Sequence, residues 1–414
     1  MSITRRGALA LPALAALPAV ARAAETVRIG SILPLTGNSA AQGQSMKQAI
    51  ELAVKIINDP TPELKPVPLA AGAGLPRLGG AKVKVIYADN QGSPSVGQSA
   101  ALRLITQDHV VALTGAYQSS VTLTSSAVAE RYGIPYVNGT STAGNLTERG
   151  YKWFFRVTPI GPDFAKLYFD FLNDVAKAGT ATTTVAIVNE NTDYGTSLAD
   201  SIAAAAGKHG KKVVLRVAYN ANSTDVSPQV LKLKSTKPDV VIFVSYTSDA
   251  ILYVKTFRTL GYRPPVLIGD DAGFSDPSFV ESVGPIAQGA LDRSVYVPGK
   301  AGSLTYKVNA LFKKETGREL DGSSARMMQA FLVLCDAISR AGSTKPDAIR
   351  EALAATDLKP NELVVDYKGV KFDSKGQNTL GYAMMIQLQG KSYVPVWPAR
   401  QATAKLELPF KGWT

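Results

Sequence analysis

The sequence predicts an α/β protein made of two Rossmann-like lobes that are joined by three crossovers of the chain. Its 414 residues exceed the length at which a single hydrophobic core stops growing, so two lobes are expected. From residue 26 onward, short β-branched runs alternate with segments of helical periodicity, which is typical of βαβ units around a parallel sheet. The alternation occurs in two consecutive series that meet near residues 155–162.

The first series begins with a strand expected over residues 27–33. A helix follows, because apolar residues recur at helical spacing from Met46 to Ile57. Residues 59–80 contain five prolines and four glycines without any period, which predicts a surface loop. The remaining elements expected here are a strand over 83–87, a helix over 94–104, a strand over 110–114, a helix after Val121 and a strand over 134–137.

The second series repeats this pattern, and the end of the chain differs from it. Residues 383–396 alternate like an antiparallel strand pair with a turn at residues 389–390. The elements expected before it are strands over 184–188, 212–217, 239–244 and 266–268, and helices over 193–205, 228–233 and 251–260. We expect lobe 1 to contain residues 24–157 and 296–380, lobe 2 to contain residues 158–295 and 381–414, and the crossovers to lie near residues 157–162, 293–298 and 378–383.

Residues 1–23 have the features of an export signal. Arg5 and Arg6 precede an apolar run over residues 8–21, and Ala21-Arg22-Ala23 is a small-x-small cleavage site. The run is shorter than the about 20 apolar residues that a membrane span needs. The arginine pair resembles a twin-arginine signal, and the general secretory route is the alternative. We therefore expect cleavage near Ala23 and a mature protein in the periplasm.

The charge of the chain argues against a nucleic-acid partner. The formal net charge is +12, and residues 1–23 contribute three arginines and no acid to it. The basic residues are scattered, and their runs are no longer than pairs such as Lys211-Lys212. Scattered charge is typical of a solvated surface, whereas a nucleic-acid site needs a basic patch.

The sequence contains no recognisable catalytic or metal-binding arrangement. Its one cysteine, Cys335, lies in the apolar stretch 330–335 and is expected to pack in a core. Its two histidines, His109 and His209, have no partner at metal-ligand spacing. Neither a nucleophile elbow nor a phosphate-binding loop is present. We therefore expect a protein that is not an enzyme and needs no metal or cofactor.

Polar and aromatic side chains follow the predicted strands, where open parallel sheets bind their ligands. Ser119 begins a helix, whose free N–H groups and positive dipole end suit a carboxylate. Asp271 belongs to the other lobe, and an acid facing a closed cleft requires a cation such as a ligand ammonium. The candidate site residues are Tyr117, Gln118, Ser119, Ser120, Thr140, Thr142, Tyr194, Tyr246, Asp270 and Asp271.

Five motifs occur in an informative order and cover nearly all of the mature sequence. They are Ile29–Gly37, Gly115–Ser120, Ile134–Tyr136, Phe154–Pro159 and Asp193–Gly195. Their order and spacing resemble the branched-chain amino-acid receptors, which are type I periplasmic binding proteins of ABC importers. The resemblance implies two lobes that close on a ligand by hinge bending.

The resemblance also implies roles on lobe 1. Ser119 matches the serine that binds the ligand carboxylate, and Thr140 matches a position that contributes backbone contacts. Thr142 matches the threonine that touches both carboxylate and ammonium. One departure is that Gln118 stands where relatives often have a cysteine.

On lobe 2, the resemblance implies that Tyr194 and Tyr246 close over the ligand and that Asp271 takes its ammonium. Asp270 is a rival for that role, because a shift of one residue in the alignment would exchange the two acids.

A second departure lies in the first loop, where Gln42-Gly43-Gln44 replaces an aromatic residue that relatives often have. Tyr117 and Phe274 are candidates to fill that volume. An amino-acid headgroup fits this pattern, but specificity for a leucine-type side chain does not follow from it.

These observations predict a periplasmic receptor that binds an amino acid or a related molecule and delivers it to the membrane permease of an ABC importer. One alternative is a receptor for an aromatic or other organic acid, or an amide, on the same fold. Another is a soluble sensor that acts on a signalling partner.

Overall fold

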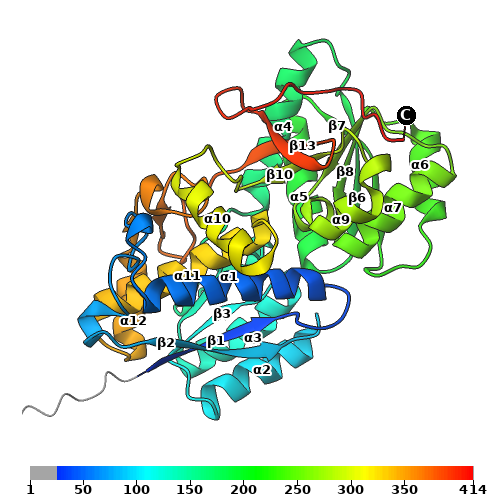
Figure 1. Cartoon of the computed structure of the whole chain (residues 1–414). Helices are drawn as coiled ribbons and strands as arrows, with labels where there is room; N and C mark the ends of the chain where they lie inside the picture. Colours follow the sequence, from blue (N-terminus) through cyan, green and yellow to red (C-terminus); the bar gives the residue numbers. More distant parts are fainter. Residues whose placement is uncertain (1–25, 414) are drawn as a thin grey trace, which may run out of the picture.

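The computed structural model describes residues 26–413, so the expected export signal with Arg5 and Arg6 lies outside the described residues. The described chain forms two α/β bodies side by side (Figure 1). One is built on a five-stranded sheet in the order β2-β1-β3-β4-β5. The other is built on a seven-stranded sheet in the order β14-β13-β10-β9-β8-β6-β7. This arrangement confirms the predicted α/β class with two lobes.

Lobe 1 contains the first sheet, whose strands are all parallel because a helix connects most neighbours. Its core includes helices from late in the chain, since α11 packs against α1. The strands are β1 (Val27–Leu33), β2 (Val83–Asp89), β3 (Ala112–Gly115), β4 (Tyr136–Asn138) and β5 (Phe154–Arg156), and the helices are α1 (Ala40–Asn58), α2 (Pro94–Thr106), α3 (Ser119–Tyr132), α10 (Leu304–Thr316), α11 (Gly322–Ala341) and α12 (Pro346–Ala354).

Lobe 2 contains the second sheet, in which β6 to β10 are parallel and β13 and β14 are antiparallel. The strands are β6 (Thr184–Glu190), β7 (Lys212–Tyr219), β8 (Val240–Val244), β9 (Val266–Gly269), β10 (Leu291–Ser294), β13 (Met384–Gln389) and β14 (Ser392–Trp397). The helices are α4 (Gly161–Lys177), α5 (Asp193–Ala206), α6 (Ser227–Thr236), α7 (Thr247–Thr259), α8 (Ala272–Ser275) and α9 (Pro277–Val283).

The chain passes between the two lobes after β5, after β10 and before β13. A short two-stranded sheet of β11 (Asp357–Leu358) and β12 (Val370–Lys371) precedes the third passage. These passages overlap the three predicted crossovers. We keep the lobe boundaries given above as a proposal.

The helices after residue 303 escaped the sequence analysis, and α11 shows why. Its residues from Gly322 to Ser339 are all buried. A helix that is buried on every side carries no amphipathic stripe, so its period is invisible in the sequence. Only the apolar character of residues 330–335 was apparent, and Cys335 is buried there as predicted.

The prediction of a surface loop over residues 59–80 is wrong in one respect. The segment is irregular, with short 3₁₀ turns at Pro62–Leu64 and Pro76–Leu78. However, it is anchored in the core of lobe 1, because Leu64 and Leu75 are fully buried. Burial of apolar side chains at irregular spacing leaves no periodic signal that a sequence pattern can detect.

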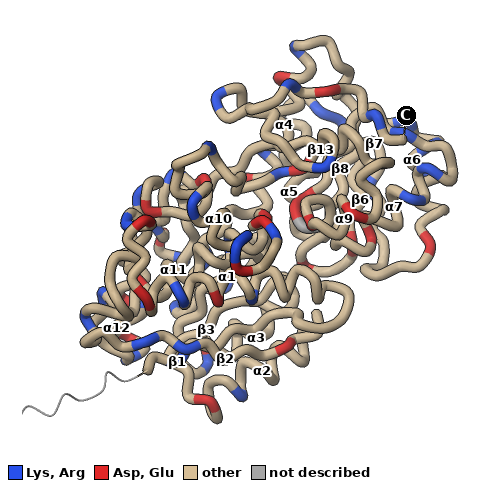
Figure 2. The backbone as a smooth tube through the Cα atoms, in the orientation of Figure 1, with Lys and Arg blue, Asp and Glu red and all other residues tan. Residues whose placement is uncertain are grey.

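Basic and acidic residues are interspersed along the backbone of both lobes, and no large block of one sign stands out (Figure 2). None of the helices in residues 26–413 has the length and apolarity needed to cross a membrane.

Candidate functional site

A small cavity lies between the two lobes, at the carboxyl ends of the strands, and its space of about 240 Å³ includes space open to solvent. Seven of its lining residues are among the ten candidates, and Ser141 is the addition. The lining residues are Tyr117, Ser119, Thr140, Ser141 and Thr142 on lobe 1, and Tyr194, Tyr246 and Asp271 on lobe 2.

The lobe 1 wall consists of the start of α3 and the loop after β4. Ser119 is buried, and its Oγ accepts a hydrogen bond from the Ala143 N–H at 3.3 Å. The Thr140 hydroxyl donates to the Ala116 carbonyl at 3.1 Å, so its hydrogen is already used. Thr142 is only 3% exposed, and its Oγ1 has no partner among residues 26–413. Because an unpaired buried hydroxyl is costly, Thr142 is suited to bind a ligand.

A glycine allows this loop to approach α11. At Gly139, an added Cβ would lie 2.6 Å from the Arg326 carbonyl oxygen, which is too close for any other residue. The loop that carries Thr140 and Thr142 therefore packs directly on the helix that carries Arg326.

Three tyrosines form the aromatic part of the cavity. The rings of Tyr117 and Tyr246 come from different lobes and lie 5.9 Å apart, and those of Tyr194 and Tyr246 lie 5.5 Å apart. Burial raises the pKa of all three hydroxyls well above the usual value, so they remain neutral. The Tyr117 hydroxyl has no partner among the described residues.

Asp271 faces the cavity from lobe 2 and is 6% exposed. Its backbone has a φ of +56°, which is unusual for a residue other than glycine, and such strain is often found at binding sites. Its carboxylate forms an ion pair with Arg326, which lies on α11 in lobe 1. The protein itself thus supplies a cation beside Asp271, where the sequence analysis expected a ligand ammonium. Arg326 escaped the sequence analysis because α11 has no recognisable period.

Asp270 does not line the cavity, and the structure thereby separates the two rival acids. It is fully buried in lobe 2, where it pairs with Arg293 at 2.7 Å (Nε) and 3.0 Å (Nη2). It also accepts hydrogen bonds from the hydroxyls of Tyr168 and Tyr194. These contacts occupy both carboxylate oxygens, so the expectation that Asp270 competes for the ligand is not supported by its position.

Gln118 and Ser120 flank Ser119 but do not line the cavity either. Gln118 precedes α3, and its side chain lies beside Gly92 instead. Ser120 is half-buried in the first turn of α3, where successive side chains point about 100° apart.

Tyr117 and Phe274 were expected to fill the space of the aromatic side chain that the first loop lacks. Only Tyr117 reaches the cavity. Phe274 packs in the core of lobe 2 with Phe279, at a ring separation of 4.9 Å, so that expectation is wrong for Phe274.

Three buried aspartates and two buried arginines form a charged cluster beside the cavity. Burial, together with the carboxylates of Asp271 and Asp270, raises the pKa of Asp292 well above its usual value. The other two aspartates form ion pairs, Asp270 with Arg293 and Asp271 with Arg326. Within residues 26–413, no group of three or more His, Cys, Asp or Glu side chains is placed to hold a metal ion.

The lobes touch each other around the cavity. The Gln42 side chain of lobe 1 donates to the Asp276 carboxylate of lobe 2 at 2.6 Å. The Gly144 N–H donates to the Ser197 Oγ of α5 at 3.0 Å. The structure is thus a closed form, in which both lobes would contact a molecule in the cavity.

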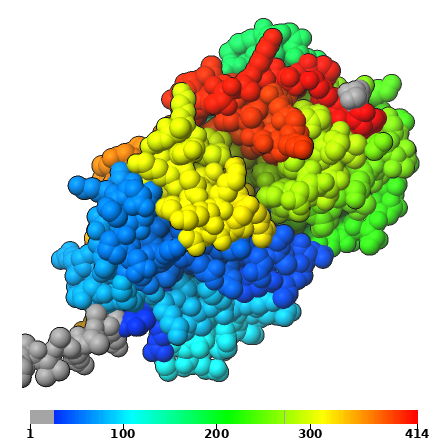
Figure 3. Space-filling view, viewed as in Figure 1, coloured from blue at the N-terminus to red at the C-terminus, as the bar shows by residue number. Residues whose placement is uncertain are grey.

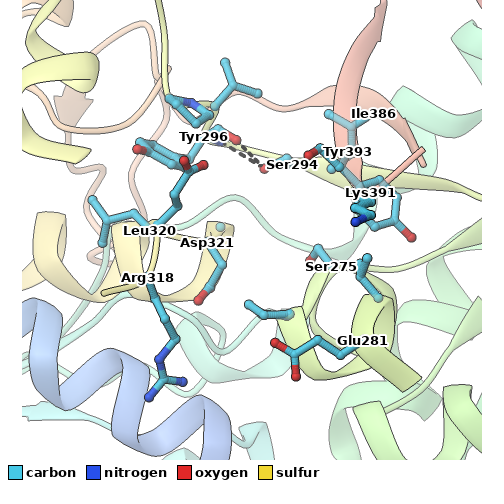
Figure 4. Close-up of a pocket in the computed structure, with 17 residues that line it drawn as sticks. Ser275, Glu281, Ser294, Tyr296, Arg318, Leu320, Asp321, Ile386, Lys391 and Tyr393 are labelled. Atoms are coloured by element: carbon cyan, nitrogen blue, oxygen red, sulfur yellow. Dashed lines mark hydrogen bonds between the residues drawn. The ribbon is translucent and has the colours of Figure 1, made fainter. Parts of the chain in front are cut away.

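A larger groove of about 1050 Å³, including space open to solvent, lies near the second crossover. It opens at the surface beside the residues that precede α11 (Figure 3). Figure 4 shows its side chains, among them Glu281, Arg318 and Lys391. None of the ten candidates lines this groove. We favour the smaller cavity as the site because seven of the ten candidates line it and because it contains buried hydroxyls that have no partner among residues 26–413.

Two α/β lobes with a polar cavity between them define a binding protein that closes like a clamp. The chain matches the periplasmic binding protein family over residues 26–389 and belongs to that family. This confirms the resemblance found in the sequence.

Comparisons with individual proteins agree with this assignment. The Leu/Ile/Val-binding protein homolog 7 of Brucella suis is 28% identical and is covered over 98% of its length by 97% of this chain. The branched-chain amino acid transporter substrate binding protein LivJ from Streptococcus pneumoniae, in complex with isoleucine, has a TM-score of 0.73 at 20% identity, with 90% of this chain and 100% of that chain covered. A solute binding protein from Rhodopseudomonas palustris in complex with 3,4-dihydroxy benzoic acid has a TM-score of 0.73 at 18% identity, with 90% and 98% covered.

Proposed function

We propose that this protein is a periplasmic receptor that binds an amino acid, or a molecule with the same headgroup, between its lobes. It delivers this ligand to the membrane permease of an ABC importer and catalyses no reaction. Residues 1–23 direct its export. The names of its curated relatives and the isoleucine complex of a structural neighbour support the ligand class.

The observation that carries this proposal is the opposite polarity of the two cavity walls. On lobe 1, the start of α3 and the Thr142 hydroxyl provide donors for a carboxylate. On lobe 2, the Asp271 carboxylate provides an acceptor for an ammonium. A zwitterion offers one charge to each wall and adds no net charge beside the two ion pairs.

A thermal-shift screen of amino acids, carboxamides and aromatic acids tests the ligand class. A ligand at a hundredfold excess over its Kd should add about 2.7 kcal/mol to the free energy of unfolding. We expect the largest shift with an amino acid. If no amino acid raises the melting temperature while an organic acid does, the proposed ligand class is wrong.

Ser119→Ala should weaken the binding of an amino acid by on the order of 1–3 kcal/mol, because one hydrogen bond to a charged group is lost. Isothermal titration calorimetry measures this effect. Ser120→Ala is the matched control, since Ser120 is the next residue of α3 but does not line the cavity. Equal effects of the two substitutions would place the carboxylate elsewhere.

An aromatic or other organic acid is the second candidate ligand. The ion pair between Asp271 and Arg326 favours it, because Asp271 is then neutralised without a ligand ammonium. The three tyrosines would provide stacking surfaces for an aromatic ring. The neighbour that contains 3,4-dihydroxy benzoic acid supports this candidate as well.

A further inference from the structure

The described part of the chain contains three arginines whose side chains are fully buried. Arg293 pairs with Asp270, and Arg326 pairs with Asp271. The third, Arg156 at the end of β5, forms no ion pair within residues 26–413 and meets only neutral acceptors. Burying a cation without an anion costs several kcal/mol, so the position of Arg156 requires an explanation.

The guanidinium of Arg156 lies behind the loop that lines the cavity. Its Nη1 donates to the carbonyl oxygens of Ala143 at 2.5 Å and Ser141 at 3.3 Å. Its Nη2 donates to the Thr147 Oγ1 at 2.8 Å. Burial lowers the pKa of Arg156 to about 9, although the carboxylates of Asp163, Glu148 and Asp373, which form no ion pair with it, act to raise that pKa.

The hydrogen bond from Arg156 to the Ser141 carbonyl polarises a peptide group that belongs to the loop lining the cavity. The Ser141 carbonyl and the Thr142 N–H belong to one planar peptide group and point in opposite directions. Because the carbonyl faces Arg156, the N–H of Thr142 points away from it, and the peptide dipole is reinforced. Thr142 lines the cavity, and its hydroxyl is unpaired within the described chain.

Arg156 also connects this loop with the crossovers. Its Nε donates to the Gln377 Oε1 at 2.7 Å, and its backbone N–H donates to the Gly376 carbonyl at 2.7 Å. The Gln377 side chain in turn donates to the Thr158 carbonyl at 2.9 Å. Arg156 therefore lies where the first and the third passages between the lobes meet.

We propose that Arg156 is a positioning residue for the ligand carboxylate. It acts through the loop of residues 140–144. Its guanidinium places a buried positive charge, opposite in sign to the ligand carboxylate, across the Ser141–Thr142 peptide. Its hydrogen bonds also hold the loop in place relative to the crossovers. This inference rests on the proposed function, because it requires a ligand with a carboxylate. The ligand anion then adds a negative charge near a cation that pairs directly with no acid of the described chain.

The test compares acids with their amides. L-alanine, L-leucine and L-phenylalanine are titrated beside their carboxamides, which lack the anionic carboxylate, into wild type, Arg156→Gln and Arg156→Lys. We expect the preference of wild type for the acid over the amide to fall roughly tenfold or more in Arg156→Gln. In Arg156→Lys, which keeps the charge but lacks the planar fork, it should fall by less.

Arg149→Gln is the matched control. Arg149 also donates to carbonyl oxygens, those of Leu146 and Leu123, but neither residue lines the cavity. This variant should keep the acid preference of wild type. If Arg156→Gln does not fold, Arg156→Lys alone decides: a reduced acid preference supports the inference.

Two outcomes are contrary and can be told apart. If the Arg156 variants lose stability or affinity but keep the full preference for acids, Arg156 has a structural role only, and the inference is overturned while the proposed function stands. If wild type binds none of the acids, the proposed function fails, and the inference fails with it.

Discussion

Replacing Asp271 with alanine should weaken the binding of an amino acid by roughly two to four decades in Kd. This range corresponds to about 3–5 kcal/mol, the effect of removing one partner from a buried charge pair. The reason is that both Arg326 and the ligand ammonium depend on the Asp271 carboxylate, and without it two cations would face each other. Isothermal titration calorimetry of wild type and variant measures the change.

Two comparisons make this result specific. A des-amino analogue should bind wild type poorly and should lose little affinity in Asp271→Ala, because Arg326 is then free to pair with an anion. Glu281→Gln, an exposed acid in the larger groove, should leave affinity unchanged. If the des-amino analogue binds wild type as tightly as the amino acid does, Asp271 holds no ammonium, and the organic acid becomes the leading candidate.

Asp270→Asn should lower the free energy of unfolding by about 3–5 kcal/mol. Asp270 is the direct partner of Arg293, whose guanidinium is fully buried and lies over the Phe164 ring. An asparagine keeps the shape of the side chain but leaves that cation with only its longer contact to the Asp271 carboxylate, at 3.5 Å. Urea denaturation without ligand measures the loss.

Asp200→Asn is the control for this measurement. Asp200 belongs to the same lobe and pairs with Arg216 at 2.6 Å, but 61% of its side chain is exposed. Exposed pairs contribute about 0–1 kcal/mol, so this variant should be nearly as stable as wild type. Similar losses in the two variants would show that Asp270 is not the essential partner of Arg293.

The strand-end residues could be located in the sequence because the strands before them are regular. The run at 184–188 is buried and β-branched, and its end places Tyr194 at the start of the following helix. Parallel strands all deliver their carboxyl ends to one edge, so residues that are distant in sequence converge there. This reasoning found seven of the eight residues that line the cavity.

The same reasoning could not find the arginines. Arg293 lies in β10, whose four residues Leu-Asp-Arg-Ser are all buried and look like a loop in the sequence. Buried ion pairs cancel the hydrophobic signal that identifies a strand. Arg326 lies on α11, where burial on all sides removes the helical period.

The sequence by itself therefore determined the α/β class, the two lobes and the edge at which polar side chains gather, because these depend on local periodicity and on the direction of the strands. Only the tertiary structure decided that Asp271 faces the cavity while Asp270 does not. It also decided that Asp271 meets Arg326 and that Arg156 meets no acid within the described chain. The physical reason is that the pairing of buried charges depends on contacts between distant segments, and such contacts leave no periodic pattern along the chain.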